Sequence, residues 1–371
     1  MEEKKSVGII TMHRPISFGS SLQAYALQKK IQDLGFDCEI IDYQYPNKLH
    51  KTKNNFIKLF LRTIAHYMLN LFMGMPCVFE RMRFKRFRKN FLKLSQYYKN
   101  SDALVKRPPE YDIYCTGSDQ VWNTNFTKRD TTFVLSFAKE KYKISYASSF
   151  AVDYIVEDCI KDFENYLSQY SNISVRERSG VGLVKQITGK TATLVCDPTL
   201  LLPKEEWFPL ANQSRINIQK PYLLVFILTY SYNPYPEVNR IIDEVQKKLG
   251  LHTVILSGNK YDYLRNNTTV IKSAGPLEFL NLFKNASFII TSSFHGVAFS
   301  ANFEKPFLAV VDKSNKDSRL LSFLETIDLL DRVISYDEKN IQLDLTMPNI
   351  NALESFRKMS ADYLNNILSQ A

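Results

Sequence analysis

Short apolar runs of strand length alternate along the chain with stretches in which apolar residues recur at helical spacing. The N-terminal part begins with the run VGIITM, continues through SLQAYALQKKIQDLG and reaches a second run, CEIIDY. A buried strand leaves a continuous apolar run, whereas a helix on a sheet repeats its apolar positions every three or four residues. This order of strand, helix and strand predicts a parallel sheet. Further strands are predicted for the runs YDIYCTG, KISYAS, SNISVR and TATLVCD.

The alternation is interrupted at residues 197–203, where two prolines bracket the letters TLLL, and it restarts with PYLLVFILTY. We therefore place a domain boundary within residues 198–220. The expected fold is α/β, with two Rossmann-like domains, residues 1–200 and 201–371, facing one another across a cleft. The second domain contains the runs VNRIIDEVQKKLG, HTVILSG, SFIITSS and FLAVVD, and it ends in an amphipathic helix over residues 351–371.

Composition fits a folded globular protein with more than one domain. The chain has 371 residues, of which 45% are hydrophobic and 23% charged, and a single core stops growing at about 250–300 residues. The five cysteines are scattered and form no C-x-x-C pair, which argues against a disulfide framework and a zinc site. The start, MEEKKSVGIITM, lacks the long apolar segment of a secretory signal. These features predict a cytoplasmic protein.

Positive charge is concentrated in residues 48–107, which we interpret as a basic helical insertion. This segment holds 15 Lys and Arg against two acidic residues, a net charge of +13, whereas the whole chain carries +10. Such a helix can lie on an anionic membrane, hold a phosphorylated lipid-linked substrate or bind nucleic acid. Alternatively, it is a solvated helix whose phenylalanines join the core. Its densest part repeats apolar residues at helical spacing: Met82, Phe84, Phe87, Phe91 and Leu94.

Neither nucleic-acid binding nor a membrane span is favoured by the rest of this segment. No recognised nucleic-acid module accompanies the basic residues, so nucleic acid is not expected as a partner. The stretch LFLRTIAHYMLNLFMGMPCVF is long enough to span a bilayer but contains Arg62, and a charge at the bilayer centre costs about 3 kcal/mol or more. The expected membrane contact is therefore peripheral, on the inner face.

The segment SFIITSSFHGVAFS places one of only five histidines where a strand passes into a helix. Parallel sheets bind ligands beyond the carboxyl ends of their strands, and the free N–H groups that begin the next helix attract anions. His295 is therefore the first candidate for a catalytic residue, although a histidine that only caps or packs would show the same pattern. Its expected neighbours in the site are Ser292, Ser293, Phe294 and Gly296.

Other predicted strand ends carry residues suited to substrate binding. TGSDQVWN follows one strand and offers Gly117, Ser118 and Asp119. SVRERSG presents Arg176 and Arg178, whose guanidinium groups suit phosphate and carboxylate; in the alternative interpretation they form surface ion pairs with residues such as Glu177. The first helix opens with a weaker anion-site signal, formed by Gly19, Ser20 and Gln23.

Seven segments, in order between residues 11 and 330, resemble the polysaccharide pyruvyl transferase family. They are TMHRPISFGSSLQAYAL, TGSDQVWN, YASSFAV, SVRERSG, CDPTLLL, SSFHGVAFSANFEKPF and KSNKDSRLLSFLETIDL. The resemblance implies a glycosyltransferase-B-like, two-domain enzyme. It also implies transfer of a pyruvyl group from phosphoenolpyruvate onto paired sugar hydroxyls, which forms a pyruvate ketal during synthesis of a surface or extracellular polysaccharide.

The same resemblance implies roles for individual residues. His295 would be the general acid that protonates the methylene carbon of phosphoenolpyruvate, because histidine titrates near neutral pH. Asp119 would be the base or would orient the acceptor hydroxyls, and Arg176 would hold the donor. Some family members have an arginine two residues before the histidine where this chain has Ser293, so neutralisation of a second anionic group would fall to Arg319 or Lys313, with Arg178 in reserve.

Two features complete the prediction of substrates. No divalent-metal cluster stands in the motifs, so no resident cofactor is expected and phosphoenolpyruvate is the donor substrate. The acceptor is expected to be a lipid-linked or nucleotide-linked saccharide. A second departure from the family's pattern lies at Ser17, Phe18 and Gly19, where family members often have Asn-Tyr-Gly. It weakens any specific contact assigned to that loop.

Two other classes of function remain open on the sequence alone. A nucleotide-sugar glycosyltransferase would share the architecture but bind a sugar nucleotide instead of phosphoenolpyruvate. A non-catalytic carbohydrate-binding protein of a polysaccharide assembly system would keep the fold and the basic segment, although it would have no need of His295 and Arg176.

Overall fold

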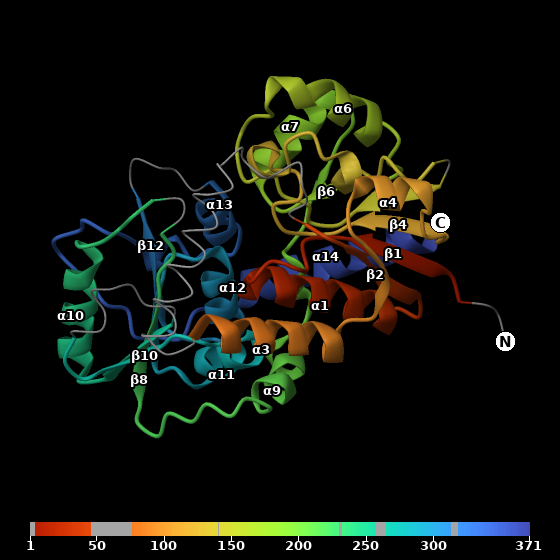
Figure 1. The fold of residues 1–371 in the computed structure, drawn as a ribbon. Coiled ribbons are helices and arrows are strands. Elements are labelled where there is room, and N and C mark those ends of the chain that lie inside the picture. The colour runs from red at the N-terminus through yellow and green to blue at the C-terminus, as the bar shows by residue number, and fades with distance from the viewer. Residues whose placement is uncertain (1–3, 46–75, 140, 230–231, 257–264, 313–317) are drawn as a thin grey trace, which may run out of the picture. The chain divides into compact units, whose positions relative to one another are not determined.

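The computed structural model describes residues 4–45, 76–139, 141–229, 232–256, 265–312 and 318–371 (Figure 1). The chain divides into two compact units. The first unit is Met1–Pro198 together with Ala361–Ala371, and the second is Thr199–Ser360.

The first unit contains a five-stranded parallel sheet in the order β3-β2-β1-β4-β5. Its direction of winding reverses between β1 and β4, so these two strands flank a topological switch point. A short pair, β6-β7, continues beyond β5 through isolated bridges at Ile144–Asn172 and Ser148–Val175. The strands are β1 Ser6–Ile10, β2 Asp37–Tyr43, β3 Leu94–Tyr98, β4 Ile113–Thr116, β5 Tyr142–Ser145, β6 Ser174–Val175 and β7 Thr193–Leu194.

Helices connect these strands, as the parallel pairing requires. The long helix α1 follows β1, and the basic helix α3 runs along it (Figure 1). Aromatic contacts join the two: the ring centroids of Phe18 and Phe84 lie 5.4 Å apart, and those of Tyr25 and Phe87 6.1 Å. The helices of this unit are α1 Phe18–Asp33, α3 Pro76–Phe91, α4 Ser101–Lys106, α5 Thr124–Thr127, α6 Glu157–Leu167 and α7 Arg178–Thr188.

The second unit repeats this design with a six-stranded parallel sheet in the order β10-β9-β8-β11-β12-β13. Its switch point lies between β8 and β11. The strands are β8 Tyr222–Phe226, β9 His252–Leu256, β10 Thr268–Ile271, β11 Phe288–Thr291, β12 Phe307–Val311 and β13 Val333–Ser335. The helices are α8 Pro198–Leu201, α9 Lys204–Ala211, α10 Val238–Leu249, α11 Pro276–Asn285, α12 Phe294–Asn302, α13 Ser318–Thr326 and α14 Asn351–Ser369.

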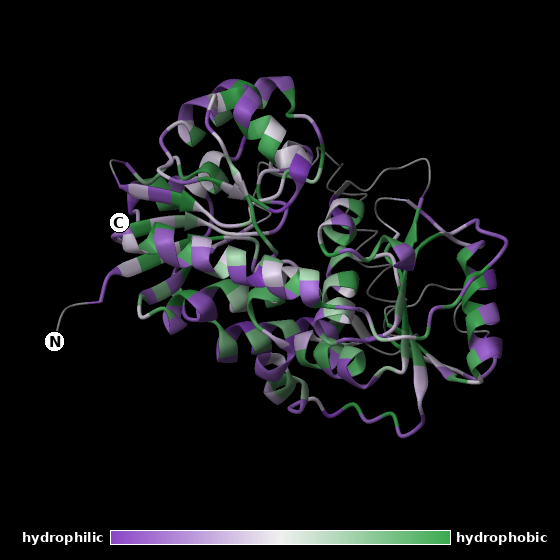
Figure 2. Cartoon of the chain, turned by 180° about the vertical axis from the view of Figure 1, so that it is seen from behind, coloured by the Kyte–Doolittle hydropathy of each residue, from purple (hydrophilic) through white to green (hydrophobic). Residues whose placement is uncertain are grey.

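Complete burial explains why these strands could be predicted from the sequence. Every residue of β4, β8, β11 and β12 is buried, and Figure 2 shows the strands of the second unit mostly as hydrophobic green, with the helices banded green and purple. Helix α10 illustrates the banding, because Val238, Ile241, Ile242 and Val245 face the core. The expected α/β fold with two parallel sheets is confirmed.

Three details differ from the expectations. Residues 94–98 of the supposed helical insertion form the edge strand β3, and Met82 is 53% exposed, so it does not belong to the buried stripe of Phe84 and Phe87. The final helix does not lie wholly in the second domain, since Ala361–Ala371 group with the first unit, where the Tyr142 hydroxyl donates to the Ile367 carbonyl at 3.2 Å.

Residues 48–75 of the insertion lie outside the described residues. Across the described helices, none has the length and apolarity needed to cross a membrane.

Candidate functional site

The switch point of the first sheet brings the loops after β1 and β4 into direct contact. The Gly117 N–H donates to the Ile10 carbonyl at 2.9 Å, and the Thr11 hydroxyl donates to the Ser118 carbonyl at 2.9 Å. A side chain at Gly117 would place its Cβ 3.0 Å from the Cβ of Thr11, closer than packed carbons normally lie. We name the carboxyl ends of β1, β4, β5, β6 and β7 the first-sheet edge.

Asp119 holds the two loops of the first-sheet edge together. One carboxylate oxygen accepts from the Gln120 N–H at 2.9 Å, and the other accepts from the Ser20 hydroxyl in the first turn of α1. Asp119 also has a φ of 73°, a left-handed conformation that aspartate tolerates better than most residues. Gln23 completes the junction by donating to the Thr11 hydroxyl at 2.9 Å. Both oxygens of Asp119 are thus occupied by protein donors, so its geometry fits an orienting role better than that of a base.

The loop after β5 is held in a strained conformation beside Asp119. Ala147 and Ala151 have φ values of 53° and 62°, and such values cost a non-glycine residue about 1–2 kcal/mol. The Ser149 N–H donates to the Asp119 carbonyl at 3.0 Å. Glu177 accepts from the N–H groups of Phe150 at 2.7 Å and Ala151 at 3.1 Å. Strained loops of this kind cluster at functional sites.

The alternative interpretation, in which Glu177 is a surface ion-pair partner of the neighbouring arginines, does not hold for this residue. Glu177 is fully buried, and its side chain bonds to backbone groups. Arg178, the first residue of α7, is exposed.

Arg176 lies inside the first-sheet edge and pairs with Asp197. Its Nη1 is 2.7 Å from Asp197 Oδ2, and the two side chains are 2% and 0% exposed. The Ser118 hydroxyl donates to the same carboxylate oxygen at 3.2 Å. This buried ion pair therefore joins the ends of β4, β6 and β7. Asp197 was missed as a site residue, although its position directly after the run TATLVC was a usable signal.

A second charged cluster, which was not predicted, fixes the loop after β1. Nε2 of His13 lies 2.9 Å from Asp42 Oδ1, and Nδ1 lies 3.1 Å from the Thr11 carbonyl. Arg14 donates twice to the Asp42 carboxylate, at 2.7 and 2.6 Å. Burial by itself would raise the pKa of Asp42, but the hydrogen bonds and charges of His13 and Arg14 prevail and lower it to about 2. The cluster anchors the segment that carries Thr11 into the first-sheet edge.

In the second unit, His295 lies where β11 passes into α12, as predicted, and β11 is one of the two strands that flank the switch point. The Thr291 hydroxyl donates to the Phe226 carbonyl at 2.7 Å, and the Ser292 hydroxyl accepts from the Leu228 N–H at 2.8 Å, so the ends of β8 and β11 are tied together. Ser293 caps α12 by accepting from the Gly296 N–H at 3.3 Å. His295 follows in the first turn and is partly exposed, whereas the residues on both sides of it are buried.

Close packing explains why glycine follows His295. A Cβ at Gly296 would lie 2.2 Å from the Thr291 hydroxyl oxygen, an impossible contact. Phe294 packs against Phe323 of α13, with ring centroids 5.5 Å apart, and Arg319 on the same helix is buried. The close contact of Gly296 with Thr291 and the packing of Phe294 on Phe323 thus fix the position of the helical turn that contains His295. Lys313 lies outside the described residues.

The sequence-predicted residues therefore form two groups, one in each unit. The first-sheet edge collects Gly19, Ser20, Gln23, Gly117, Ser118, Asp119 and Arg176, and the second switch point collects Ser292, Ser293, Phe294, His295 and Gly296. Among the side chains that the structure describes, no group of three His, Cys, Asp or Glu is placed to hold a metal ion.

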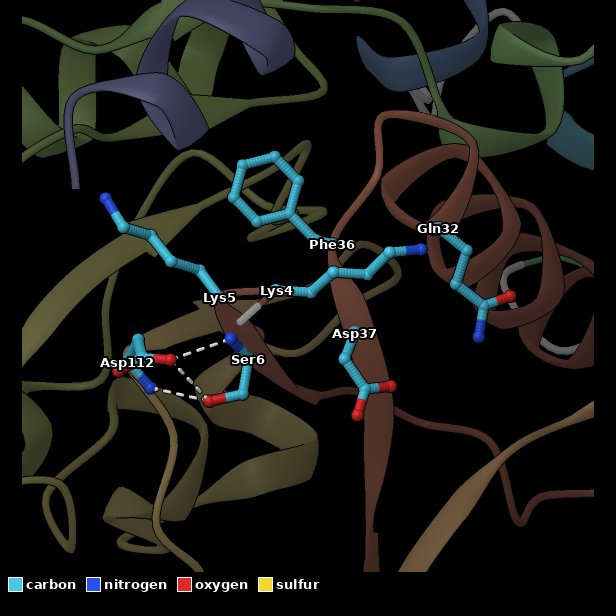
Figure 3. Close-up of a pocket in the computed structure, with 7 residues that line it drawn as sticks. All are labelled: Lys4, Lys5, Ser6, Gln32, Phe36, Asp37 and Asp112. Carbon is cyan, nitrogen blue, oxygen red and sulfur yellow. Dashed lines mark hydrogen bonds between the residues drawn. The ribbon is translucent and has the colours of Figure 1, made fainter. Parts of the chain in front are cut away.

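A separate cavity of about 820 Å³ lies at the opposite, amino-terminal end of the first sheet (Figure 3). Figure 3 shows the Asp112 carboxylate bonded to the N–H and hydroxyl of Ser6, both at 2.7 Å, while Lys4, Lys5 and Gln32 line the rim. Parallel sheets place their sites at the carboxyl ends of strands, and the Asp112 carboxylate is already occupied. We therefore locate the candidate sites at the switch points instead.

Comparison with solved structures shows which fold these two sheets form. UDP-GlcNAc 2-epimerase from Methanocaldococcus jannaschii, in complex with UDP-GlcNAc and UDP, is similar over 100% of both chains, with 14% identity and a TM-score of 0.54. The UDP-GlcNAc 2-epimerase of Neisseria meningitidis, bound to UDP-GlcNAc, is similar over 98% of this chain and 100% of its own, with 10% identity and a TM-score of 0.54. A comparison with functionally curated proteins by sequence found no match.

The two parallel sheets and these similarities define an α/β protein of the glycosyltransferase-B class of fold. Within this class, the model of the polysaccharide pyruvyl transferase family matches residues 18–314, which include β4 and the switch point between β8 and β11. The chain belongs to the polysaccharide pyruvyl transferase family.

Proposed function

We propose that the protein transfers a pyruvyl group from phosphoenolpyruvate to two hydroxyls of a sugar, forming a pyruvate ketal in the synthesis of a surface polysaccharide. The observation that carries the proposal is the placement of His295: a partly exposed histidine in the first turn of α12, at a switch point, inside the region that defines the family.

The reaction needs one proton donor and a site for two anionic groups. Protonation of the methylene carbon of phosphoenolpyruvate by His295 leaves cationic character at C2, which one sugar hydroxyl attacks. The second hydroxyl then displaces inorganic phosphate, and the two hydroxyl protons leave to a base or solvent. Arg176, held rigidly by Asp197, is proposed to supply positive charge for the donor. Asp119 and Ser20 are proposed to orient hydroxyl groups. No resident cofactor or metal is proposed.

One finding favours a second candidate, an enzyme that acts on a nucleotide sugar. The structurally similar epimerases were solved with UDP-GlcNAc bound, and the same fold would accommodate such a ligand here. This candidate would use the anion-binding groups for a diphosphate and would not require phosphoenolpyruvate.

Calorimetric titration separates the two candidates. We expect saturable binding of phosphoenolpyruvate to the wild-type protein, unchanged in excess chelator, and no binding of UDP-GlcNAc at the same concentrations. Binding of UDP-GlcNAc alone would replace the proposed function with the nucleotide-sugar candidate. Binding of phosphoenolpyruvate that disappears with chelator would overturn the metal-independent reaction.

We further propose that helix α3 holds the protein against the anionic inner face of a membrane, close to a lipid-linked acceptor. Phe84 and Phe87 are buried against α1, so the phenylalanine stripe does join the core. The opposite face carries the exposed apolar residues Val78, Phe79 and Met82, which are 44%, 55% and 53% exposed. The exposed basic residues of α3 are Arg81, Lys85, Arg86 and Lys89. Apolar side chains among cations are typical of helices that lie in a bilayer interface.

Removing two of these charges should weaken membrane binding. A Lys85→Gln, Lys89→Gln variant is expected to lose about 10-fold to 30-fold in affinity for vesicles containing phosphatidylserine, since each surface cation contributes about 1 kcal/mol. Sedimentation with vesicles measures this. The matched control removes Lys247 and Lys358, which are exposed on α10 and α14. Equal losses of vesicle affinity in the two variants would show that only the net charge of the protein matters, which would contradict the proposal. Unchanged binding in the α3 variant would also refute it.

A further inference from the structure

Two tyrosines stack at the carboxyl end of the second sheet. The rings of Tyr232 and Tyr336 have centroids 5.9 Å apart and an interplanar angle of 26°. Both residues are only half-buried. Each is anchored to β12, because the Tyr232 hydroxyl donates to the Val310 carbonyl at 2.8 Å and the Tyr336 N–H donates to the Val311 carbonyl at 3.1 Å. The pair is therefore a fixed aromatic surface that solvent reaches.

The sheet order places this pair beside the His295 turn. Tyr232 comes from the loop after β8, and Tyr336 directly follows β13. Strand β11, which leads into Ser292 and His295, lies between β8 and β12. Tyr232 thus reaches over the end of β11 to bond with β12. Neighbouring strands are about 4.8 Å apart, so β13 lies about 10 Å from β11, within the reach of one or two sugar rings.

Three carboxylates, those of Asp312, Asp337 and Glu237, act on Tyr336. The charge of Asp312, which directly follows β12, is the main cause that raises the pKa of Tyr336, followed by burial and by the charges of Asp337 and Glu237. A surface with these carboxylates repels a donor that carries phosphate and carboxylate groups. It suits a neutral ligand with many hydroxyls, because carboxylates accept hydrogen bonds from hydroxyls and aromatic faces cover apolar C–H surface.

We propose that Tyr232 and Tyr336 form a platform that binds a neutral sugar ring of the acceptor saccharide, with Asp312 accepting hydrogen bonds from its hydroxyls. That the bound sugar is the acceptor rests on the proposed function, whereas the binding of a saccharide to the two tyrosines does not. The platform assigns the acceptor to the ends of β12 and β13, beside the His295 turn.

A printed array of bacterial polysaccharide fragments and hexose-terminated oligosaccharides tests the platform. We expect the wild type to bind a subset of the glycans and Tyr336→Ala to lose about tenfold or more in affinity for them, the equivalent of about 1.4 kcal/mol. Tyr336→Phe, which keeps the ring, should retain most of the binding, and Asp312→Asn should weaken it. Tyr154→Ala is the matched control, since Tyr154 is an exposed tyrosine of the first unit. Thermal unfolding checks that each variant is folded.

The outcomes separate this inference from the proposed function. Glycan binding that depends on Tyr336, together with unchanged phosphoenolpyruvate titration in Tyr336→Ala, supports the platform. A wild type that binds no glycan, or a folded Tyr336→Ala that binds as the wild type does, overturns it. Loss of phosphoenolpyruvate binding in Tyr336→Ala with glycan binding retained would assign these tyrosines to the donor and also overturn it. If the wild type binds glycans through Tyr336 but not phosphoenolpyruvate, the platform survives and the proposed transfer reaction fails.

Discussion

Replacing His295 with alanine is expected to abolish ketal formation while leaving the affinity for phosphoenolpyruvate nearly unchanged. A positioned general acid contributes about 10²-fold to 10⁴-fold to the rate, and its loss stops the protonation on which the later attack at C2 depends. The ground-state donor presents its phosphate and carboxylate to other groups, so its binding should survive. Phosphate release from phosphoenolpyruvate in the presence of a saccharide identified on the array measures the rate, and calorimetry measures the binding.

The control for this experiment is another histidine of the same unit. His252 begins β9, at the opposite end of the sheet, and bonds to the side chains of Asn267 and Thr269 at 2.9 and 2.8 Å. His252→Ala should therefore keep the wild-type rate. A His295→Ala variant that is folded and releases phosphate as fast as the wild type would remove His295 from the chemistry. A parallel loss of donor affinity would make it a binding residue.

Strands could be predicted from the sequence where all their residues are buried, but not where their residues are only partly buried. Strands such as β8 and β11, buried on both faces, leave continuous apolar runs that periodicity detects. The edge strands β3 and β10 have mixed or intermediate burial, and their sequences, LSQYY and TTVI, carry no such run. Because many basic residues precede β3, the whole segment was interpreted as helical. Edge strands are short and half-solvated, so local sequence specifies them weakly.

The candidate site was predictable as far as strand ends could be located. Ser118, Asp119, Arg176 and His295 all follow strands, and the switch-point rule indicates what such positions do. The position of Asp197 after a strand was a usable signal, but its pairing was not predictable, because Asp197 is 21 residues from Arg176 and 79 from Ser118. No local pattern marks a buried carboxylate as distinct from a solvated one. The roles of these residues in binding and catalysis stay predictions.

The buried pair of Arg176 and Asp197 makes the second large prediction, on stability. Removing one partner leaves an uncompensated charge in a region where both side chains are at most 2% exposed, and such a loss costs about 3–5 kcal/mol. We expect Asp197→Ala to lower the free energy of unfolding by about that amount, and Arg176→Ala to do the same. Urea denaturation followed by circular dichroism measures both values.

A double variant then decides what Arg176 does. Arg176→Met combined with Asp197→Leu removes both charges and keeps much of the side-chain volume, so it should recover most of the stability that either single change loses. If this refolded variant still fails to bind phosphoenolpyruvate, the charge of Arg176 serves the donor, and loss of binding in Arg176→Ala is more than a consequence of unfolding. If it binds the donor as the wild type does, Arg176 and Asp197 serve only to hold the loops of the first-sheet edge, and the donor's negative charge is met elsewhere.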